Sequence, residues 1–204
     1  QGAGYFPVAD QKIQDFYTEK YGVVHPTKAG LKIPEIFDAA INKEVKGLWI
    51  IGEDIVQTDP NSNHVIQAME ALDLLVVQEI FMSETAKYAD VVLPGTTFLE
   101  KDGTFTNTER RVQRVNRAAK PLPGTKPDGV IVTDMMQKLG YDQKTYDADE
   151  VLAEIADIVP FFKGITRERL GKLGLQWPVK EDGTDTKILH EKEFKLGKGR
   201  LKYF

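Results

Sequence analysis

Three short apolar runs restrict the fold of this sequence more than any other feature. They are Leu48–Ile51, Leu74–Val77 and Val91–Leu93, and polar or turn-forming residues follow each one directly. Runs that are apolar throughout are typical of strands buried on both faces, as in a parallel sheet covered by helices. Between the first two runs, Asp59-Pro60-Asn61 is a helix-start signal with Pro60 in the first turn, and apolar residues at helical spacing follow it. Strand, helix and strand in succession form a βαβ unit. We therefore predict a three-layer, Rossmann-like α/β domain with a mainly parallel sheet.

Helical spacing and cap residues predict further helices before and after the three runs. They cover Asp10–Tyr21, Pro34–Asn42, Asp128–Leu139, Asp149–Val159 and Thr166–Leu173, with Asp128 as the N-cap of its helix. Residues 174–204 are rich in Gly, Lys and Asp and carry isolated apolar residues, which indicates an extended tail that lies on another surface. We therefore predict an α/β domain over 1–145 and a helical and extended tail over 146–204 that leads to a following domain.

The composition excludes several kinds of function. The 204 residues include no cysteine, which excludes disulfides, thiolate catalysis and iron–sulfur or cysteine–zinc sites carried by this chain. His25, His64 and His190 lie far apart and no carboxylate pattern joins them, so we predict no metal site. A net charge of −4 gives no reason to expect binding to nucleic acid or to an anionic membrane.

Location and extent can also be inferred from the sequence. No apolar run approaches the roughly 18 residues of a membrane span. No signal peptide opens the chain, so we expect no membrane insertion and a cytoplasmic protein. The start at Gln1 indicates that the chain was cut from a longer protein.

Each apolar run ends in a polar cluster. The clusters are Gly52-Glu53-Asp54 with Thr58, then Gln78-Glu79, and then Pro94-Gly95-Thr96. The last cluster opens a polar, Gly- and Thr-rich turn whose side chains are not expected to form a core. Parallel strands bring their carboxyl ends to one edge of the sheet, which is where doubly wound folds bind dinucleotides. The clusters therefore suggest a nucleotide site at this edge, where Gly52 permits close backbone approach and the side chains after the second run accept from ribose hydroxyls.

Two carboxylates are candidates for reading a base. Asp54 and Asp128 could each pair with guanine, whose N1–H and exocyclic amine present two donors side by side. The alternative is purely structural, because Gly, Asp and Thr after a strand are usually turn formers and Asp128 before a helix is usually an N-cap. The sequence contains neither G-x-G-x-x-G nor G-x-x-x-x-G-K-[ST], so no motif indicates NAD or ATP.

Longer motifs resemble a known family. LWIIGEDIVQTDPN, LDLLVVQEIF, ETAKYADVVLP, EKDGTFTNTERRVQ, KPD, GLQWP and GKGR occur in that order across nearly the whole chain. Together they resemble the molybdopterin oxidoreductases, and most closely the large subunit of formate dehydrogenase. The resemblance implies a domain that binds part of a molybdopterin guanine dinucleotide. Matched residue by residue, it assigns contacts with this cofactor to Gly52, Glu53, Asp54, Thr58, Gln78 and Asp128, and a backbone contact to Gly95.

The resemblance also implies what the whole enzyme does. In such enzymes formate is oxidised to carbon dioxide at molybdenum or tungsten, which is held by two pterin dithiolenes and a Cys or selenocysteine. An N-terminal iron–sulfur cluster removes the electrons. This chain has no cysteine and no match to the catalytic His–Arg context, so we expect an internal domain that lacks catalytic residues. The isolated chain is expected to be inactive and to hold no cofactor.

Other expectations concern partners and alternatives. The expected partners are the remaining domains of the same subunit, together with electron-transfer subunits. The alternatives are another enzyme of the family, such as a nitrate reductase or the large subunit of a NADH dehydrogenase, and a non-catalytic scaffold.

The segment from Glu109 to Arg114, with Arg117 and Lys120, is the one basic patch of the sequence. It lacks the wide positive face and the aromatic stacking residues of a nucleic-acid site, so we expect a solvated face or an interdomain contact. The resemblance places this segment near the pterin and adds Asn107 and Arg110 as weaker candidates for the site.

Overall fold

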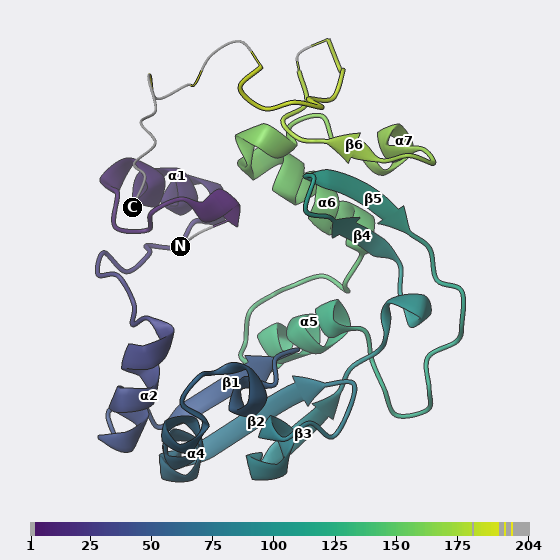
Figure 1. Cartoon of the computed structure of the whole chain (residues 1–204). Coiled ribbons are helices and arrows are strands. Elements are labelled where there is room, and N and C mark those ends of the chain that lie inside the picture. Colours follow the sequence, from purple (N-terminus) through teal and green to yellow (C-terminus); the bar gives the residue numbers. More distant parts are fainter. Residues whose placement is uncertain (1–2, 181, 192–193, 195–196, 198–204) are drawn as a thin grey trace, which may run out of the picture. The chain divides into compact units, whose positions relative to one another are not determined.

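The computed structural model describes residues 3–180, 182–191, 194 and 197. Its internal contacts divide the chain into two units (Figure 1). The first unit comprises the chain up to Asp102 together with Asn116–Ala148, and the second unit comprises Gly103–Val115 together with the chain from Asp149 onward. This division differs from the sequence-based one at 145/146, because the segment 103–115 belongs to the second unit.

A three-stranded parallel sheet forms the centre of the first unit (Figure 1). Its strands, in spatial order, are β1 (Gly47–Ile51), β2 (Leu74–Glu79) and β3 (Val91–Pro94). In the register of the ladder, Ile51 lies beside Gln78, and Gln78 lies beside Leu93. The parallel sheet predicted from the three apolar runs is confirmed, and β2 extends further than predicted because it includes Gln78 and Glu79.

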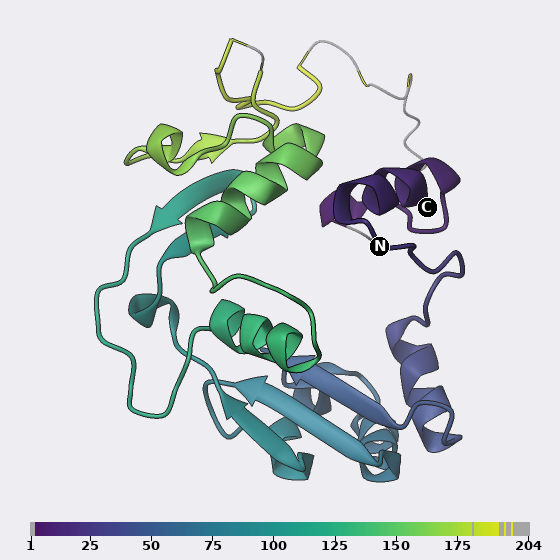
Figure 2. The same ribbon diagram turned by 180° about the vertical axis from the view of Figure 1, so that it is seen from behind.

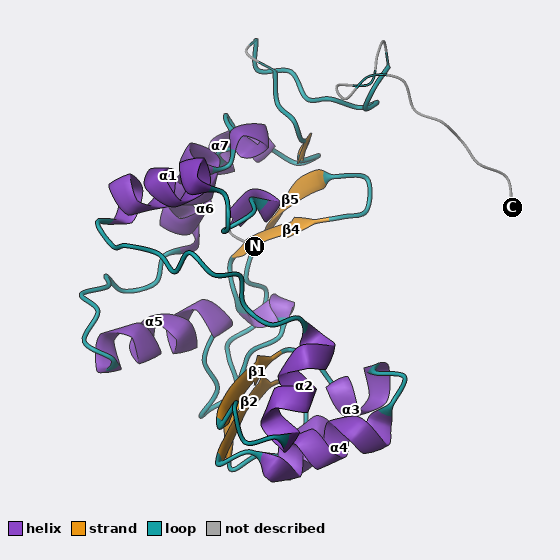
Figure 3. Ribbon diagram, turned by 90° about the vertical axis from the view of Figure 1, so that its left-hand side faces the viewer, coloured by secondary structure: helices purple, strands orange, loops and turns teal. Residues whose placement is uncertain are grey.

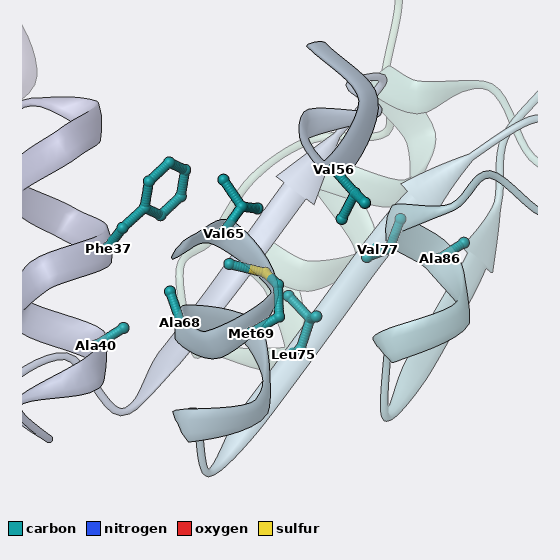
Figure 4. Packing of buried hydrophobic residues seen from close by; sticks show 9 residues of the cluster. All are labelled: Phe37, Ala40, Val56, Val65, Ala68, Met69, Leu75, Val77 and Ala86. Carbon is teal, nitrogen blue, oxygen red and sulfur yellow. The ribbon is translucent and has the colours of Figure 1, made fainter. Parts of the chain in front are cut away.

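Helices cover both faces of this sheet and give the predicted three layers (Figures 1 and 3). One face carries α2 (Ile33–Ile41), α3 (Ile55–Thr58), α4 (Ser62–Ala71) and the 3-10 turn η2 (Thr85–Tyr88), and the other carries α5 (Asp128–Lys138). Apolar side chains fill the space between the first group and the sheet, among them Phe37, Val65 and Leu75 (Figure 4). Burying each such side chain stabilises the fold by about 1.5–3 kcal/mol.

The first helix begins and ends where its cap residues predict. In α1 (Gln11–Tyr21), the carboxylate of the N-cap Asp10 accepts from the backbone N–H of Lys12, and Gly22 ends the helix in the left-handed conformation. Two further 3-10 turns of the first unit are η1 (Ala3–Tyr5) and η3 (Phe98–Glu100).

Two details of the predicted helix starts are wrong. Pro60 lies outside α4, because the side chain of Asn61 caps this helix by accepting from the backbone N–H of His64. Asp128 is the first residue of α5 and not its N-cap, a position that Pro127 occupies. The carboxylate of Asp128 is bonded to side chains of other segments, which accounts for the difference.

The second unit contains an antiparallel sheet that the sequence did not predict. Its strands, in spatial order, are β4 (Gly103–Thr106), β5 (Arg111–Val115) and β6 (Leu175–Gln176). Its helices are α6 (Ala148–Ile158), η4 (Pro160–Phe162) and α7 (Arg167–Leu170). Figure 2 shows α6 beside the hairpin of β4 and β5, and Val112, Leu152, Ile165 and Leu170 form a small core of their own.

Two sequence-based interpretations are corrected by this unit. The stretch after Val91–Leu93 was interpreted as a turn whose side chains form no core, yet Val112 is completely buried. The part from Gly174 onward was interpreted as an extended tail, yet Leu175 and Gln176 pair with β5. The end of that predicted tail, from residue 198, lies outside the described residues. Within the described part of the chain, no helix has the length and apolar character needed to cross a membrane.

Candidate functional site

The carboxyl edge of the parallel sheet, where β1, β2 and β3 end, brings the predicted clusters together. Gly52 follows β1 directly, and its N–H donates to the carbonyl of Gln78 over 2.9 Å. Gly95 follows β3 directly, and its N–H donates to the carbonyl of Glu79 over 3.0 Å. Gly52 is exposed and has a φ of 61°, a left-handed conformation that glycine adopts without steric penalty. An exposed glycine at this edge leaves its backbone open to close approach.

Asp128, the first residue of α5, is bonded to this edge through its carboxylate. Oδ1 accepts from Nε2 of Gln78 over 2.8 Å, and Oδ2 accepts from Nζ of Lys101, with which it forms an ion pair. The side chain of Asp128 keeps 38% exposure, whereas Gln78 is completely buried. Gln78 therefore orients the carboxylate from within the protein, and Asp128 is the acceptor that a ligand can reach.

Gly95 gives the carboxylate of Asp128 its room. A Cβ at position 95 would lie 3.0 Å from Oδ1 of Asp128, so the carboxylate would have to shift to admit a side chain. Gly95 is itself buried. Packing against Asp128 thus accounts for the missing side chain, and the backbone contact with a cofactor stays a prediction.

Asp128 is held in its charged form. Burial acts to raise the pKa of Asp128, but the hydrogen bonds from Lys101 and Gln78 and the positive charge of Lys101 outweigh it, so the pKa lies below its usual value. An ionised carboxylate only accepts hydrogen bonds, and here it favours ligands that present N–H or O–H donors.

Two buried polar atoms, one at the end of β2 and one just after β3, have no hydrogen-bond partner among the described residues. They are Oε1 of Gln78 and Oγ1 of Thr96. An unpaired buried polar group typically costs about 1–3 kcal/mol. Nε2 of His25 and Nε1 of Trp49 are also buried without a partner among the described residues, so such atoms do not by themselves distinguish this edge.

Asp54 has a structural role at the end of β1. Its Oδ1 accepts from the N–H and from the hydroxyl of Thr85, over 2.9 and 2.7 Å. These bonds fasten the loop after β1 to η2. Burial acts to raise the pKa of Asp54, but the hydrogen bonds from Thr85, Gln57 and Glu84 together outweigh it and lower the pKa. Both carboxylates proposed for guanine thus accept hydrogen bonds from the protein on each oxygen, Asp54 from Glu84 and Thr85 and Asp128 from Gln78 and Lys101.

The other predicted contacts lie in different surroundings. The hydroxyl of Thr58 donates to Oε1 of Glu53 over 2.7 Å, and both residues are exposed. Asn107 and Arg110 belong to the second unit and make internal bonds there. Oδ1 of Asn107 accepts from the backbone N–H of Glu109 and of Arg111, so Asn107 holds the hairpin turn.

Arg110 clamps several segments of the second unit. Its guanidinium donates to the carbonyls of Trp177, Thr186 and Lys187, and it lies 5.6 Å from the centre of the Trp177 ring. These contacts account for Arg110 without any ligand.

Lys101 is the residue of this site that sequence reasoning missed. It follows η3 and lies 27 residues before Asp128. Its only signal in the sequence is its place in EKDGTFTNTERRVQ, a segment that we associated with a basic patch and not with the sheet edge. Among the described residues, no three His, Asp or Glu side chains gather as a metal site would require. The expected absence of a metal stays a prediction.

Comparison with known proteins identifies the family. The model of the molybdopterin oxidoreductase family matches residues 17–138. A protein of Staphylococcus haemolyticus (strain JCSC1435) named "Putative formate dehydrogenase" is 42% identical over 205 residues, which are 100% of this chain and 21% of that protein. A protein of Staphylococcus aureus (strain USA300) with the same name is 42% identical over 202 residues, or 98% of this chain and 20% of that protein.

The fold has a counterpart among solved structures. Acetylene hydratase from Pelobacter acetylenicus superposes with a TM-score of 0.57 at 22% identity, over 76% of this chain and 22% of that chain. This likeness concerns the fold alone. The chain belongs to the molybdopterin oxidoreductase family, which implies a molybdopterin cofactor. It spans about one fifth of the length of the curated relatives that it matches.

Proposed function

We propose that this chain is the part of a formate dehydrogenase that holds the guanosine end of a molybdopterin guanine dinucleotide. Family membership supports a pterin cofactor, and the names of the curated relatives favour formate dehydrogenase over a nitrate reductase or a NADH dehydrogenase. The observation that carries the proposal is the accessible, ionised carboxylate of Asp128 at the carboxyl edge of a parallel sheet.

The residues at this edge fit the guanine base. Guanine presents N1–H and an amine as adjacent donors, and a carboxylate can accept from both. Adenine instead presents the acceptor N1 beside its amine, so the same carboxylate would face a lone pair. The exposed backbone of Gly52 allows the ligand to approach β1 closely. Gln78 has no exposed surface, so its role is indirect: it orients Asp128 through a hydrogen bond.

The division of labour in the enzyme follows from this role. When bound, the metal–pterin centre supplies the redox chemistry of formate oxidation, and the protein binds and orients it. This chain contributes acceptors for the nucleotide and no catalytic residue of its own. The remaining domains of the same subunit complete the site, and electron-transfer subunits accept the electrons.

Titration calorimetry with GDP and ADP tests this proposal on the 204-residue chain. GDP should bind weakly, because the domains that bury the cofactor are not part of this chain. ADP should bind about tenfold less tightly, since its N1 leaves the carboxylate without one donor. UDP controls for binding through the phosphates alone. Equal affinity for GDP, ADP and UDP, or no affinity for GDP, would contradict the proposal.

A further inference from the structure

We infer that Lys101 is a positioning residue that fixes the carboxylate of Asp128 for selecting guanine. This inference rests on the proposed function and extends it to a residue outside the predicted cofactor contacts. Several neighbours constrain this carboxylate. Gln78 holds Oδ1 from β2, Lys101 holds Oδ2 from the segment after η3, and Gly95 carries no side chain that would displace Oδ1 from this position. The orientation of the carboxylate is therefore set by a partner on each of its two oxygens.

The backbone that carries Lys101 is itself anchored. Glu100, next to it, is buried and accepts from the backbone N–H of Thr97 over 2.9 Å and of Leu122 over 3.0 Å. The carbonyl of Leu99 accepts from two further backbone N–H groups, those of Ala118 and Ala119. These bonds restrict the position from which the lysine reaches Asp128. Less side-chain and backbone freedom is lost on pairing than in an exposed ion pair between two mobile chains.

A second ion pair on the same helix provides an internal comparison. Lys126 binds Asp134 of α5 over 2.6 Å, but the lysine side chain is 59% exposed. The side chain of Lys101 is 29% exposed. Both pairs join a lysine to an aspartate of α5. The carboxylate that pairs with Lys101 also accepts from Gln78, whereas Lys126 pairs with Asp134. Loss of the Lys126 pair should thus leave the base site unchanged.

Orientation of the carboxylate decides which base it can read. Each oxygen of Asp128 accepts from Gln78 or Lys101, and because a carboxylate oxygen has more than one lone pair, it can also accept from a ligand. A fixed carboxyl plane accepts simultaneously from the N1–H and the amine of guanine. Hypoxanthine has the same N1–H and lacks the amine. Lys101 should therefore contribute to the preference for GDP over IDP, and not merely to the stability of the fold.

The titration of Asp128 tests the contact with Lys101 independently of nucleotide binding. Lys101 is the charged side chain bonded to this carboxylate, while β2 supplies the neutral Gln78 and the end of β3 supplies Gly95. The phenol ring of Tyr146 packs against Gly129, the next residue of α5. Removing the cation should move the titration midpoint of Asp128 upward, whether or not nucleotide is present.

The test measures GDP and IDP affinities and the carboxyl titration of Asp128 by carbon-13 NMR in four proteins: wild type, Lys101→Gln, Lys101→Arg and Lys126→Gln. Lys101→Gln should lower the ratio of GDP to IDP affinity about two- to fivefold, the range expected for a partly exposed ion pair, and raise the midpoint of Asp128. Lys101→Arg should restore both, and Lys126→Gln should change neither. Thermal unfolding checks that all four proteins fold.

The two ways of failing are distinguishable. If the wild type binds GDP and Lys101→Gln keeps both the wild-type preference and the wild-type midpoint, the role of Lys101 is overturned and the proposed function stands. If the wild type does not bind GDP, the proposed function is overturned, and the selectivity role of Lys101 with it.

Discussion

Asp128→Ala is expected to weaken the binding of GDP about tenfold or more, because the N1–H and amine of guanine lose their acceptor. The variant should still fold, because Asp128 is the first residue of α5 and not its cap, but its stability should fall by about 1–3 kcal/mol because the buried Nε2 of Gln78 loses its acceptor. A carboxylate in the first turn contributes only about 0.3–1 kcal/mol through the helix dipole. Calorimetric titration measures the affinity, and thermal unfolding measures the stability.

Asp134→Ala is the matched control for this prediction. Asp134 belongs to the same helix and pairs with a lysine in the same way, but the hydrogen bond from the amide of Gln78 goes to Asp128. The Asp134→Ala variant should bind GDP as tightly as the wild type does. Asp128 does not read the base if Asp128→Ala and Asp134→Ala bind GDP with the same affinity.

Asp54→Ala is expected to lower the free energy of unfolding of the first unit by about 1–3 kcal/mol, the cost of leaving buried donors unpaired. The N–H and hydroxyl of Thr85 would lose their acceptor, and this hydroxyl in turn accepts from the backbone N–H of Val56 over 3.1 Å. Hydrogen exchange at the amides of Val56 and Thr85 should accelerate. GDP affinity should change less than in Asp128→Ala.

The same carboxylate makes stability depend on pH. The pKa of Asp54 is lowered in the folded protein. Its contribution to the free energy of unfolding is therefore complete above its ordinary pKa near 3.8, and it is lost as the pH falls through the pKa of the folded protein. Asp59→Ala is a suitable control for the exchange measurement, because Asp59 accepts from an exposed backbone N–H, that of Asn61. Equal exchange rates in Asp54→Ala and Asp59→Ala would contradict the structural role of Asp54.

The parallel sheet could be predicted from the sequence because its strands are apolar on both faces. Leu74–Val77 has no polar residue, and helices cover both sides of that strand. The antiparallel sheet could not be predicted for the opposite reason. Three of the four residues of β4 are exposed, and β6 consists of two residues. Such strands carry no hydrophobic period, and only their pairing identifies them.

The candidate site could be predicted in its location but not in its bonding. Parallel strands necessarily place Gly52 and Gln78 at one edge, and the register confirms that they do so. No spacing indicates that Asp54 would bind Thr85, 31 residues away, or that Lys101 would bind Asp128. Which carboxylate remains accessible is decided by tertiary contacts.

The central claim is that the guanosine end of the cofactor lies at the carboxyl edge of the parallel sheet. The most direct measurement is an NMR titration of the isotope-labelled chain with GDP, observed residue by residue. The account predicts that the amide signals of Gly52, Gly95 and Asp128 shift with GDP and much less with ADP, while those of β4 and β5 stay in place. Shifts concentrated in β4 and β5, or equal shifts with GDP and ADP at the sheet edge, would contradict it.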